Sequence, residues 1–452
     1  MGVIISLSSN LVRHEWVETV FPRPAGGGCR LMLENLRGSP RTFKVLVASA
    51  LVENTAFGLI IPYLTIYMVY DVLSSEPEDT AIFLAGLVLM TYTLAGMPSI
   101  LLGGALADRI GRKPVLLASL GLMSLTILMY FFANSFWTLV FLAFADSFVG
   151  SMYMPAANAM IADIIPTAER PKAYSTLRIA WNVGIIAGPV FGWVMVAAYS
   201  IRELFIFGAV ILAIAFVMNL VFIRETRPKD ARREVINLRT VFSVAKDRPF
   251  LVLCALSAVF WFFFSQWIAV LPVYAKGELG IEVAQFGILF AVSAAMTVAL
   301  QLWVTSKTVN MRRSLVLMTG QITCAIGFAL IFFATDFNSL LVCIAVITIG
   351  ELIYMSIISA IIADFAPGER RGTYMGFSGL IQTLGSGVGF LFGMWLLGAL
   401  SDKEQVWLVF GAIGIVSSIG YITFARMIGP SKDRPFMKLD GKSCEAESPK
   451  PL

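Results

Sequence analysis

Gly104-Ala105-Leu106-Ala107-Asp108-Arg109-Ile110-Gly111-Arg112-Lys113 lies between two long apolar stretches of the chain, and this segment decides the fold. It combines three cations and one acid with two glycines. Glycine permits sharp turns, and cationic loops between membrane spans face the cytoplasm. The segment therefore predicts a tight, positively charged cytoplasmic turn that joins two membrane-spanning helices.

The composition extends this prediction to the whole chain. Of 452 residues, 58% are hydrophobic and only 14% are charged, with a mean hydropathy of +0.81. A soluble protein of this size could not bury so much apolar surface. Apolar segments of roughly 20 residues, long enough to cross a bilayer, recur along the sequence. The fold class that we predict is an all-α polytopic membrane protein.

Twelve membrane-spanning helices are expected, an even number that leaves both termini on one side. If that side is the cytoplasm, 28 of the 34 Lys and Arg fall in cytoplasmic segments, and Lys44 and Arg426 lie at the cytoplasmic ends of their spans; Arg202, Lys276 and Lys403 fall outside, and Arg178 lies within a span. This bias follows the positive-inside rule, so the isoelectric point near 8.9 reflects topology and predicts no nucleic-acid partner. The predicted spans are 44–69, 81–105, 114–133, 136–161, 174–198, 203–223, 249–275, 283–306, 314–333, 338–362, 374–398 and 404–428.

An internal repeat of about two hundred residues predicts that the spans form two six-helix bundles in parallel arrangement. Residues 162–170 recur as 363–370 with one deletion; Tyr174, Gly150 and Arg112-Lys113 recur as Tyr374, Gly350 and Arg312-Arg313, and Thr308 stands where the first copy has Asp108. The expected domains are a cytoplasmic tail over 1–43 (with Met32 as an alternative start), bundles over 44–223 and 249–428, a cytoplasmic linker over 224–248 and a cytoplasmic tail over 429–452.

Several kinds of chemistry are excluded by what the sequence lacks. His14 is the only histidine, and the five cysteines show no paired or metal-ligand spacing. We therefore expect no catalytic residues, no metal site and no cofactor. No G-x-x-x-x-G-K-[ST] phosphate-binding loop is present, so the chain alone cannot use ATP. The sequence does not predict an enzyme.

Charged residues inside the predicted spans cost roughly 2.5–3.5 kcal/mol each on insertion, so each needs a reason. Glu53, Asp146 and Glu351 lie near the middle of the first, fourth and tenth spans. A carboxyl group that is buried or close to another acid holds its proton more tightly than in water, which suits proton coupling. We predict that these acids couple transport to protons and bind a cationic cargo; the alternative for each is a hydrogen-bonded structural role.

Polar and aromatic residues elsewhere in the spans are further candidates for the cavity. Arg178 lies about one turn inside the fifth span, where its side chain can extend to the interface or pair with an acid. The block Trp261–Trp267 in the seventh span can hold apolar or cationic molecules. Lipid-facing or packing roles explain at least half of these aromatics equally well, and Trp261 and Gln266 cannot both be assumed to face the cavity.

Small residues also recur in the fifth span. Gly184, Gly188 and Gly192 lie one turn apart, with Pro189 in the helix interior. Glycines four residues apart allow a neighbouring helix to approach closely, and proline kinks a helix. The physical expectation is tight packing in this part of the span.

Together these segments resemble the major facilitator superfamily, and the resemblance covers 44–428. The pattern G-x-L-A-D-R-x-G-R-K over Gly104–Lys113 is similar to the loop between the second and third helices of that family. The glycine–proline segment is similar to the antiporter motif of its drug-export branches, except that Trp193 stands for the last glycine. Arg178-x-x-x-Asn182 also resembles proton-coupled drug antiporters, whereas Asp146 stands where many relatives carry an arginine.

The resemblance implies a role for the charged turn as a cytoplasmic gate. In the family, the acid of this turn caps the eleventh helix and pairs with arginine when the transporter opens outward. The residues implied here are Gly104, Asp108, Arg109, Gly111, Arg112 and Lys113. Asp108 would then interact with the positive N-terminal end of the helix that starts near Tyr374, and Arg109 and Arg112 with acids such as Asp163 and Asp364. A basic loop that only sets topology is the alternative.

The function expected is secondary active transport with alternating access, as proton-coupled efflux of small amphipathic or cationic compounds. A proton-coupled metabolite importer is the alternative, and a non-transporting membrane sensor is a third reading. The expected partners are a small-molecule substrate, protons and membrane lipid, without nucleic acid. We expect a multi-pass protein of the cell membrane that acts as a monomer.

Overall fold

The computed structural model describes residues 36, 38–166, 169–227, 243–309, 311–366 and 370–433. Within these ranges all regular structure is helical, and eleven segments are long and apolar enough to cross a membrane. Helix α13 (Gln285–Thr308) covers the remaining predicted span, but its apolar part, Gln285–Gln301, is shorter. The all-α polytopic class is confirmed, and the twelfth span stays a prediction.

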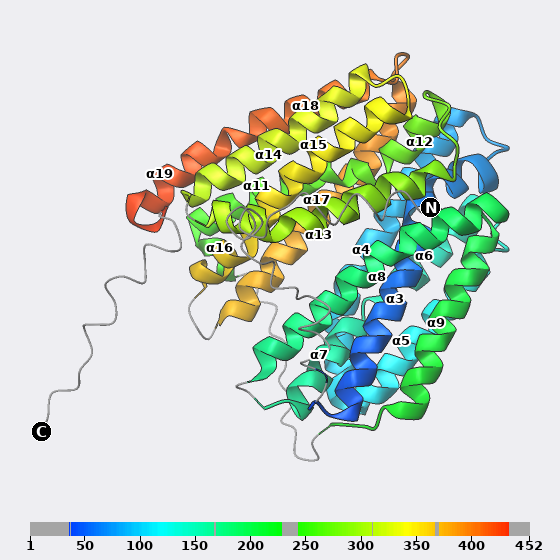
Figure 1. Cartoon of the computed structure of the whole chain (residues 1–452), viewed down its shortest axis with the longest axis vertical. Helices are drawn as coiled ribbons and strands as arrows, with labels where there is room; N and C mark the ends of the chain where they lie inside the picture. Colours follow the sequence, from blue (N-terminus) through cyan, green and yellow to red (C-terminus); the bar gives the residue numbers. More distant parts are fainter. Residues whose placement is uncertain are drawn as a thin grey trace, which may run out of the picture.

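The helices from the first part of the chain lie together on one side of the molecule (Figure 1). Their contacts include α3 with α8, α3 with α9 and α4 with α6. This N-terminal group consists of α3 (Arg41–Tyr67), η1 (Met68–Val72), α4 (Glu78–Ile110), α5 (Arg112–Tyr130), α6 (Phe136–Gly150), α7 (Tyr153–Ile164), α8 (Arg170–Ala198) and α9 (Glu203–Phe222).

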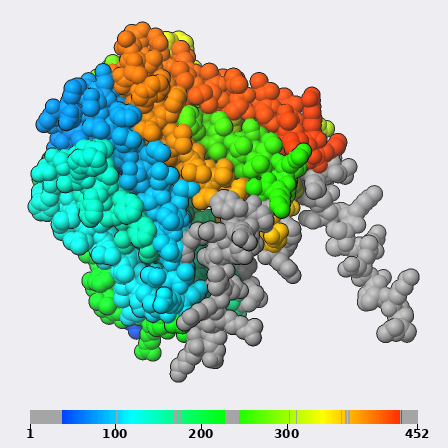
Figure 2. All heavy atoms as spheres, turned by 180° about the vertical axis from the view of Figure 1, so that it is seen from behind, coloured from blue at the N-terminus to red at the C-terminus, as the bar shows by residue number. Residues whose placement is uncertain are grey.

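The helices from the second part form the other group, with contacts such as α14 with α15 and α11 with α17. This C-terminal group consists of η3 (Ser243–Lys246), α11 (Arg248–Phe264), η4 (Ser265–Trp267), α12 (Val270–Gly277), α13, α14 (Arg313–Leu330), η5 (Ile331–Phe333), α15 (Phe337–Met355), α16 (Ile358–Phe365), α17 (Arg371–Ala399), α18 (Gln405–Ser418) and α19 (Gly420–Lys432). From behind, α4 and α17 run side by side between the groups (Figure 2).

Matched local structures occur in the two groups. Helices α6 and α15 each begin with a capping box, formed by Ser135 with Thr138 and by Asp336 with Ser339. Such a box satisfies backbone N–H groups that a helix start leaves free. These equivalent positions therefore specify the same helix start twice.

The buried polar contacts repeat as well. Tyr153 of α7 donates a hydrogen bond to Ser49 Oγ of α3 at 3.3 Å, and Tyr354 of α15 donates one to Ser257 Oγ of α11 at 3.0 Å. All four side chains are buried. A buried hydroxyl needs a partner in an apolar interior, so each pair fixes how its two helices pack.

The charged segment differs from the predicted element. The charged segment is not a turn throughout: α4 continues to Ile110, α5 begins at Arg112, and only Gly111 between them leaves the helix, with φ 115°. Gly104 is an ordinary helical residue.

Four predicted spans are also interrupted rather than continuous. The breaks separate α6 from α7, α11 from α12, α15 from α16 and α18 from α19. The apolar runs hide these breaks, because hydropathy reports depth in the membrane and not backbone continuity. The tails predicted over 1–43 and 429–452 and the linker over 224–248 lie mostly outside the described residues.

Candidate functional site

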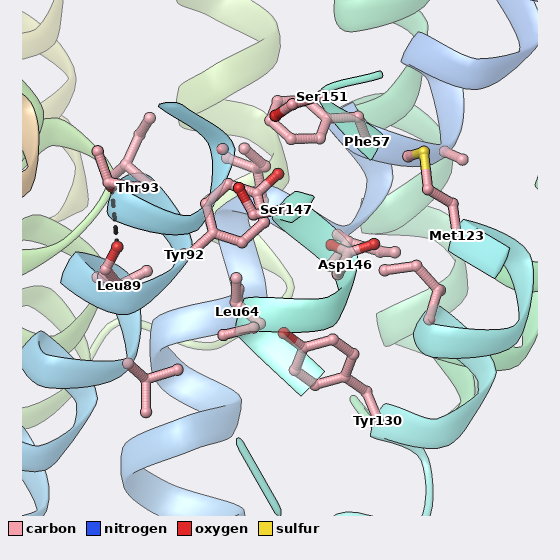
Figure 3. Close-up of a pocket in the computed structure, with 18 of the residues that line it drawn as sticks. Phe57, Leu64, Leu89, Tyr92, Thr93, Met123, Tyr130, Asp146, Ser147 and Ser151 are labelled. Carbon is pink, nitrogen blue, oxygen red and sulfur yellow. Dashed lines mark hydrogen bonds between the residues drawn. The ribbon is translucent and has the colours of Figure 1, made fainter. Parts of the chain in front are cut away.

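A cavity of about 350 Å³ lies among the central helices, and most of its wall is apolar. Two of the three predicted membrane acids, Glu53 of α3 and Asp146 of α6, line it. Figure 3 shows Tyr92, Ser147 and Asp146 around this space. The C-terminal group contributes Ile268, Thr383 and Phe390 to the lining, so the acidic side of the cavity belongs to the N-terminal group.

Asp146 is held by a neighbouring helix. Its side chain is only 7% exposed, and Thr126 of α5 donates a hydrogen bond to Oδ1 at 3.1 Å. The same hydroxyl lies 3.0 Å from the carbonyl oxygen of Met123. Thr126 therefore orients the carboxyl group toward the cavity, a contact that sequence reasoning did not identify.

Glu53 is less satisfied than Asp146. Its Oε2 atom is buried and has no hydrogen-bond partner within the described part of the chain. A buried oxygen without a partner is costly, by about 1–3 kcal/mol. Tyr92 of α4 lies within electrostatic reach of both Glu53 and Asp146. The two acids thus share one chamber, and Glu53 offers it an open acceptor.

The third predicted acid, Glu351, does not line this cavity. It lies on α15, near Cys324 of the neighbouring helix α14. Gly350 explains that close packing, because a side chain there would meet the backbone of Cys324. The structure therefore brings Glu53 and Asp146 together and places Glu351 apart from them.

The other predicted cavity residues also lie outside the lining. Arg178 and Asn182 are exposed on α8. Trp261 packs edge-on against Phe260 and Phe264. An aromatic packing role, one of the readings left open by the sequence, fits Trp261.

Gln266 has a structural contact set. It is fully buried, and its Nε2 donates to the carbonyl oxygens of Phe262 at 2.7 Å and of Gly389 at 2.9 Å. These bonds tie the break between α11 and α12 to α17. The break needs such a partner because it leaves backbone groups without helical hydrogen bonds.

Arg112 is the centre of the charged segment. It is 6% exposed; its NH2 group lies 3.0 Å from Asp108 Oδ1 and its Nε 3.0 Å from Asp163 Oδ2. The Nε contact lacks the alignment of a hydrogen bond, so Arg112 and Asp163 form an ion pair by distance alone. Arg112 also donates to the carbonyl oxygen of Ala107 at 3.1 Å. Asp108 therefore has a partner within its own helix group in this structure.

Glu225 completes this network and was not predicted. Its carboxylate accepts the backbone N–H groups of Arg112 at 3.0 Å and Lys113 at 3.1 Å, and those of Thr226 and Arg227. Burial raises the pKa of Glu225, but these backbone hydrogen bonds outweigh it and leave the pKa below its ordinary value. Glu225 comes soon after α9, the last helix of its half, and faces the start of α5, the third. An acid at that place in the sequence is the signal that could have identified it.

The C-terminal group holds a matching network. Arg313 pairs with Asp364 at 2.8 Å, as Arg112 does with Asp163. Asp433 accepts the backbone N–H of Ser314 at 2.9 Å and its hydroxyl at 2.7 Å, which is the role of Glu225 in the first half. The charged-segment scaffold is therefore duplicated, although the acid at Asp108 is not.

The glycines of the fifth span pack as expected. A side chain at Gly184 would meet the backbone of Leu51 at 2.5 Å, and one at Gly188 would meet Gly58 at 2.5 Å. Gly192 faces Tyr63 and Leu59. This row of glycines lets α8 and α3 approach closely.

The same row recurs in α17, which the sequence analysis missed. Gly385, Gly389 and Gly393 face Ala258, Phe262 and Gln266 of the break-containing span α11–α12. Phe390 follows the second of these glycines where the first half has Pro189. The glycine spacing is therefore a packing device of both halves, and only the proline distinguishes the first.

Contacts between the two groups gather at the face predicted to be external. Lys403 Nζ lies 3.4 Å from Glu78 of the N-terminal group and 3.5 Å from Glu278 of its own. Tyr70 donates to the carbonyl oxygen of Val273 at 3.3 Å, and Lys276 Nζ lies 4.1 Å above the Tyr70 ring. We call these contacts the outer seam.

Arg202, the remaining cation predicted to be external, pairs with Asp71 through two nitrogens at 2.9 Å. Both residues belong to the N-terminal group, so this pair braces one half and does not cross the outer seam. No group of three or more His, Cys, Asp or Glu within the described residues is arranged to hold a metal ion.

Comparison with known proteins gives a consistent result. A family model described as Major Facilitator Superfamily matches residues 46–389 and 269–446. A Na(+), Li(+), K(+)/H(+) antiporter from Planococcus maritimus is 26% identical over 407 residues, which is 82% of this chain and 91% of that protein. Multidrug resistance protein MdtH from Salmonella typhimurium is 25% identical over 322 residues, or 70% and 78% of the two chains.

The fold is similar to that of solved transporters. The crystal structure of a POT family transporter in complex with 5-aminolevulinic acid superposes with a TM-score of 0.72 at 14% identity, and the match covers 87% of this chain and 98% of that one. At this sequence identity, the similarity shows a shared fold and nothing more.

Proposed function

Because this chain belongs to the major facilitator superfamily and is a multi-pass protein of the cell membrane, we propose that it exports small amphipathic or cationic compounds in exchange for protons. The family consists of secondary transporters, not enzymes. The single observation that carries the proposal is the pair Glu53 and Asp146 in one largely apolar cavity. Apolar walls accept the body of an amphipathic molecule, and a carboxylate accepts its positive charge.

Proton coupling follows from the same pair. A proton and a cationic cargo compete for a carboxylate, because each neutralises its charge. In a desolvated chamber the empty, unprotonated state is costly, so the site exchanges one ligand for the other. Asp146 has its hydroxyl partner in Thr126, whereas Glu53 Oε2 has an unfilled acceptor. We therefore assign cargo binding to Glu53 first.

A second candidate is exchange of alkali cations for protons. It is favoured by the similarity over most of its length to the Planococcus maritimus protein, which is named as a Na(+), Li(+), K(+)/H(+) antiporter. Carboxylate and hydroxyl oxygens are suitable ligands for such ions. Ser147 and Ser151 line the cavity near Asp146. Both candidates use the same acids. Only transport of amphipathic compounds requires the apolar wall of the cavity.

Alternating access would come from rocking of the halves 44–223 and 249–428. The outer seam and the α17 glycines support a state closed at the external end: Gly398 and Gly387 face Asp79 and Thr93 of α4, whereas a side chain at Gly376 or Gly379 would meet nothing within 4 Å. In this state the proposed cytoplasmic gate is open, which agrees with Asp108 pairing inside its own group.

The gate has its own test. Asp108→Asn should leave the protein folded, because Arg112 retains Asp163 and Ala107, but should slow transport by about tenfold if the acid closes the gate against α17. Thermal unfolding in detergent and uptake into vesicles measure the two effects. Near-normal transport would remove the gate role.

Transport is tested with purified protein in liposomes that contain a pH-sensitive dye. A proton gradient is imposed and amphipathic cations, neutral amphipathic compounds or Na+, Li+ and K+ are added in separate arms. Cargo movement opposite to proton movement supports antiport, and the arm that responds chooses between the two candidates. Movement in the same direction would make the protein an importer.

Variants of the cavity sharpen this test. Glu53→Gln should abolish exchange of cations, whereas Phe390→Ala should impair transport of amphipathic cargo and leave alkali cations unaffected. Trp261→Phe, outside the cavity, is the matched control. Full transport by Glu53→Gln would contradict the proposed site.

A further inference from the structure

Helix α13 carries a polar stripe that the cavity does not use. Ser293, Thr297, Gln301 and Thr305 follow one another at intervals of four residues. Residues four apart lie on one face of a helix. All four are half-buried, whereas Val298 and Trp303 on other faces are 65% and 55% exposed. The stripe is therefore turned toward the protein, whereas Val298 and Trp303 are turned away from it.

Two hydrogen bonds lie within the stripe, one at each end. Thr297 donates to the carbonyl oxygen of Ser293 at 3.0 Å, and Gln301 Nε2 donates to Thr305 Oγ1 at 3.2 Å. At the cytoplasmic end of the helix, Thr308 Oγ1 lies 3.0 Å from Ser356 Oγ. Polar groups at such spacing can pass a proton through intervening waters.

Glu351 lies one turn beyond a contact between α15 and this stripe. Thr348, one turn before Glu351 on α15, donates to Ser293 Oγ at 2.9 Å. The contacts Ser293–Thr348 and Thr308–Ser356 show that α13 and α15 run in the same direction. Thr297 and Glu351 each lie about one turn beyond the Ser293–Thr348 contact on their own helices. They therefore lie at the same level, about 5–6 Å further along.

We propose that Glu351 exchanges protons with the cytoplasmic face along the α13 stripe, by a route separate from the cavity that holds Glu53 and Asp146. A membrane-embedded carboxyl group is costly without a function, and this one lies outside the cargo chamber. The inference rests on the proposed proton coupling and adds the path that the proton takes on the cytoplasmic side.

The charged and titratable groups around Glu351 are few in the described ranges. Helix α14 brings Cys324. Helix α13 brings hydroxyl and amide groups until Lys307 near its cytoplasmic end, and α16 brings Asp364, which is paired with Arg313. Of the polar groups named here, those of the stripe extend from the level of Glu351 to the cytoplasmic end of α13.

The first test measures water access without reference to transport. Single cysteines replace Thr297, Gln301, Thr305 and, as the control, Val298 in a chain whose five native cysteines are serine. A membrane-impermeant cationic thiol reagent is applied to the cytoplasmic side of inside-out vesicles. The three stripe positions should react at least about tenfold faster than position 298. Equal rates at all four positions, or no reaction on the stripe, would overturn the route.

The second test measures proton movement. Gln301→Leu should slow cargo-driven proton movement in dye-loaded liposomes by about tenfold, as expected when one group of a proton route is lost. The affinity of the cavity for a fluorescent cation should stay within about twofold, because the stripe does not line the cavity. Trp303→Leu on the lipid face of the same helix is the control.

The outcomes separate this inference from the proposed function. If the unaltered protein moves cargo with no protons, proton-coupled transport fails, and the route fails with it whatever the labelling shows. If the unaltered protein couples cargo to protons but Gln301→Leu does so equally well, only the route fails. Loss of cation affinity in Gln301→Leu would assign the stripe to cargo binding and overturn it as a proton route.

Discussion

Gly111 is the residue at which the chain reverses between α4 and α5, and two features require glycine there. Its φ of 115° with ψ 157° lies in a region that side chains avoid, and a Cβ atom would lie 2.5 Å from Glu225 Oε2. The close approach is what allows the carboxylate of Glu225 to reach the first N–H groups of α5.

We predict that Gly111→Ala lowers the free energy of unfolding by about 1–3 kcal/mol, the usual cost of such a backbone conformation. Gly104→Ala is the control, since its Cβ would meet only Pro155 at 3.9 Å. Thermal unfolding in detergent compares the two. Similar melting temperatures for both variants would show that the reversal tolerates a side chain.

Glu225→Gln should cost about 1 kcal/mol at neutral pH, the typical value of a helix cap. The pKa of Glu225 is lowered in the folded protein, so its stabilisation is present above the unfolded pKa. It is lost as the pH falls through the folded pKa. The difference in unfolding temperature between the variant and the unaltered protein should therefore shrink on acidification, and a constant difference would contradict this.

At the scale of helices, the two glycine rows govern packing in both halves. A Cβ atom at Gly188 would meet backbone of Gly58 and Leu59, and one at Gly389 would meet backbone of Phe262. Backbone cannot move aside as a side chain can.

Gly188→Ala and Gly389→Ala should therefore each destabilise the protein by about 1–3 kcal/mol, as overpacking does. Gly379→Ala, which meets nothing within 4 Å, is the matched control on α17. Folded yield and thermal unfolding measure the effect. If only Gly188→Ala destabilised the protein, the glycine row of α8 would have a role that the row of α17 lacks, as expected of an antiporter motif.

The sequence predicted helices better than their interruptions. Apolar length located eleven of the predicted spans. The break at Ser265–Trp267, by contrast, depends on Gln266 reaching Gly389, which is 123 residues away. Likewise, Glu225 and Asp433 can cap α5 and α14 only when the last helix of each half packs beside the third helix of that half. Local patterns cannot specify such contacts, because each depends on tertiary packing.

The candidate site was predicted in part for the same reason. Depth in the membrane found Glu53 and Asp146, which share a cavity, but depth alone also grouped Glu351 with them. Whether an acid lines the cavity depends on which face of its helix carries the side chain, and depth in the membrane does not give that. The regular spacing from Ser293 to Thr305 was visible in the sequence and would have pointed to a second polar region.

For the molecule as a whole, Lys403 connects the halves at the face predicted to be external. It is 15% exposed and lies near acids from both groups. A side chain at Gly376 or Gly379, toward the other end of α17, would meet nothing within 4 Å, so the contact at Lys403 contributes to the preference for the observed state.

Lys403→Gln should shift the population toward the outward-open state by about fivefold, corresponding to loss of about 1 kcal/mol of ion-pair energy. Spin labels at positions 75 and 401, on outer loops of opposite halves, report the distance. Arg202→Gln is the control, because its pair with Asp71 lies within one half. An unchanged distance distribution in Lys403→Gln would show that the outer seam holds without it.

The unequal division of the cavity between the two halves has an evolutionary consequence. Its acids lie on α3 and α6, whereas Ile268, Thr383 and Phe390 form the facing wall without carrying charge. Substitutions in that wall would reshape the range of accepted molecules while the acids keep their role. Under the proposed export function, a population exposed to a new toxic cation gains tolerance through substitutions in this wall, while Glu53 and Asp146 stay unchanged.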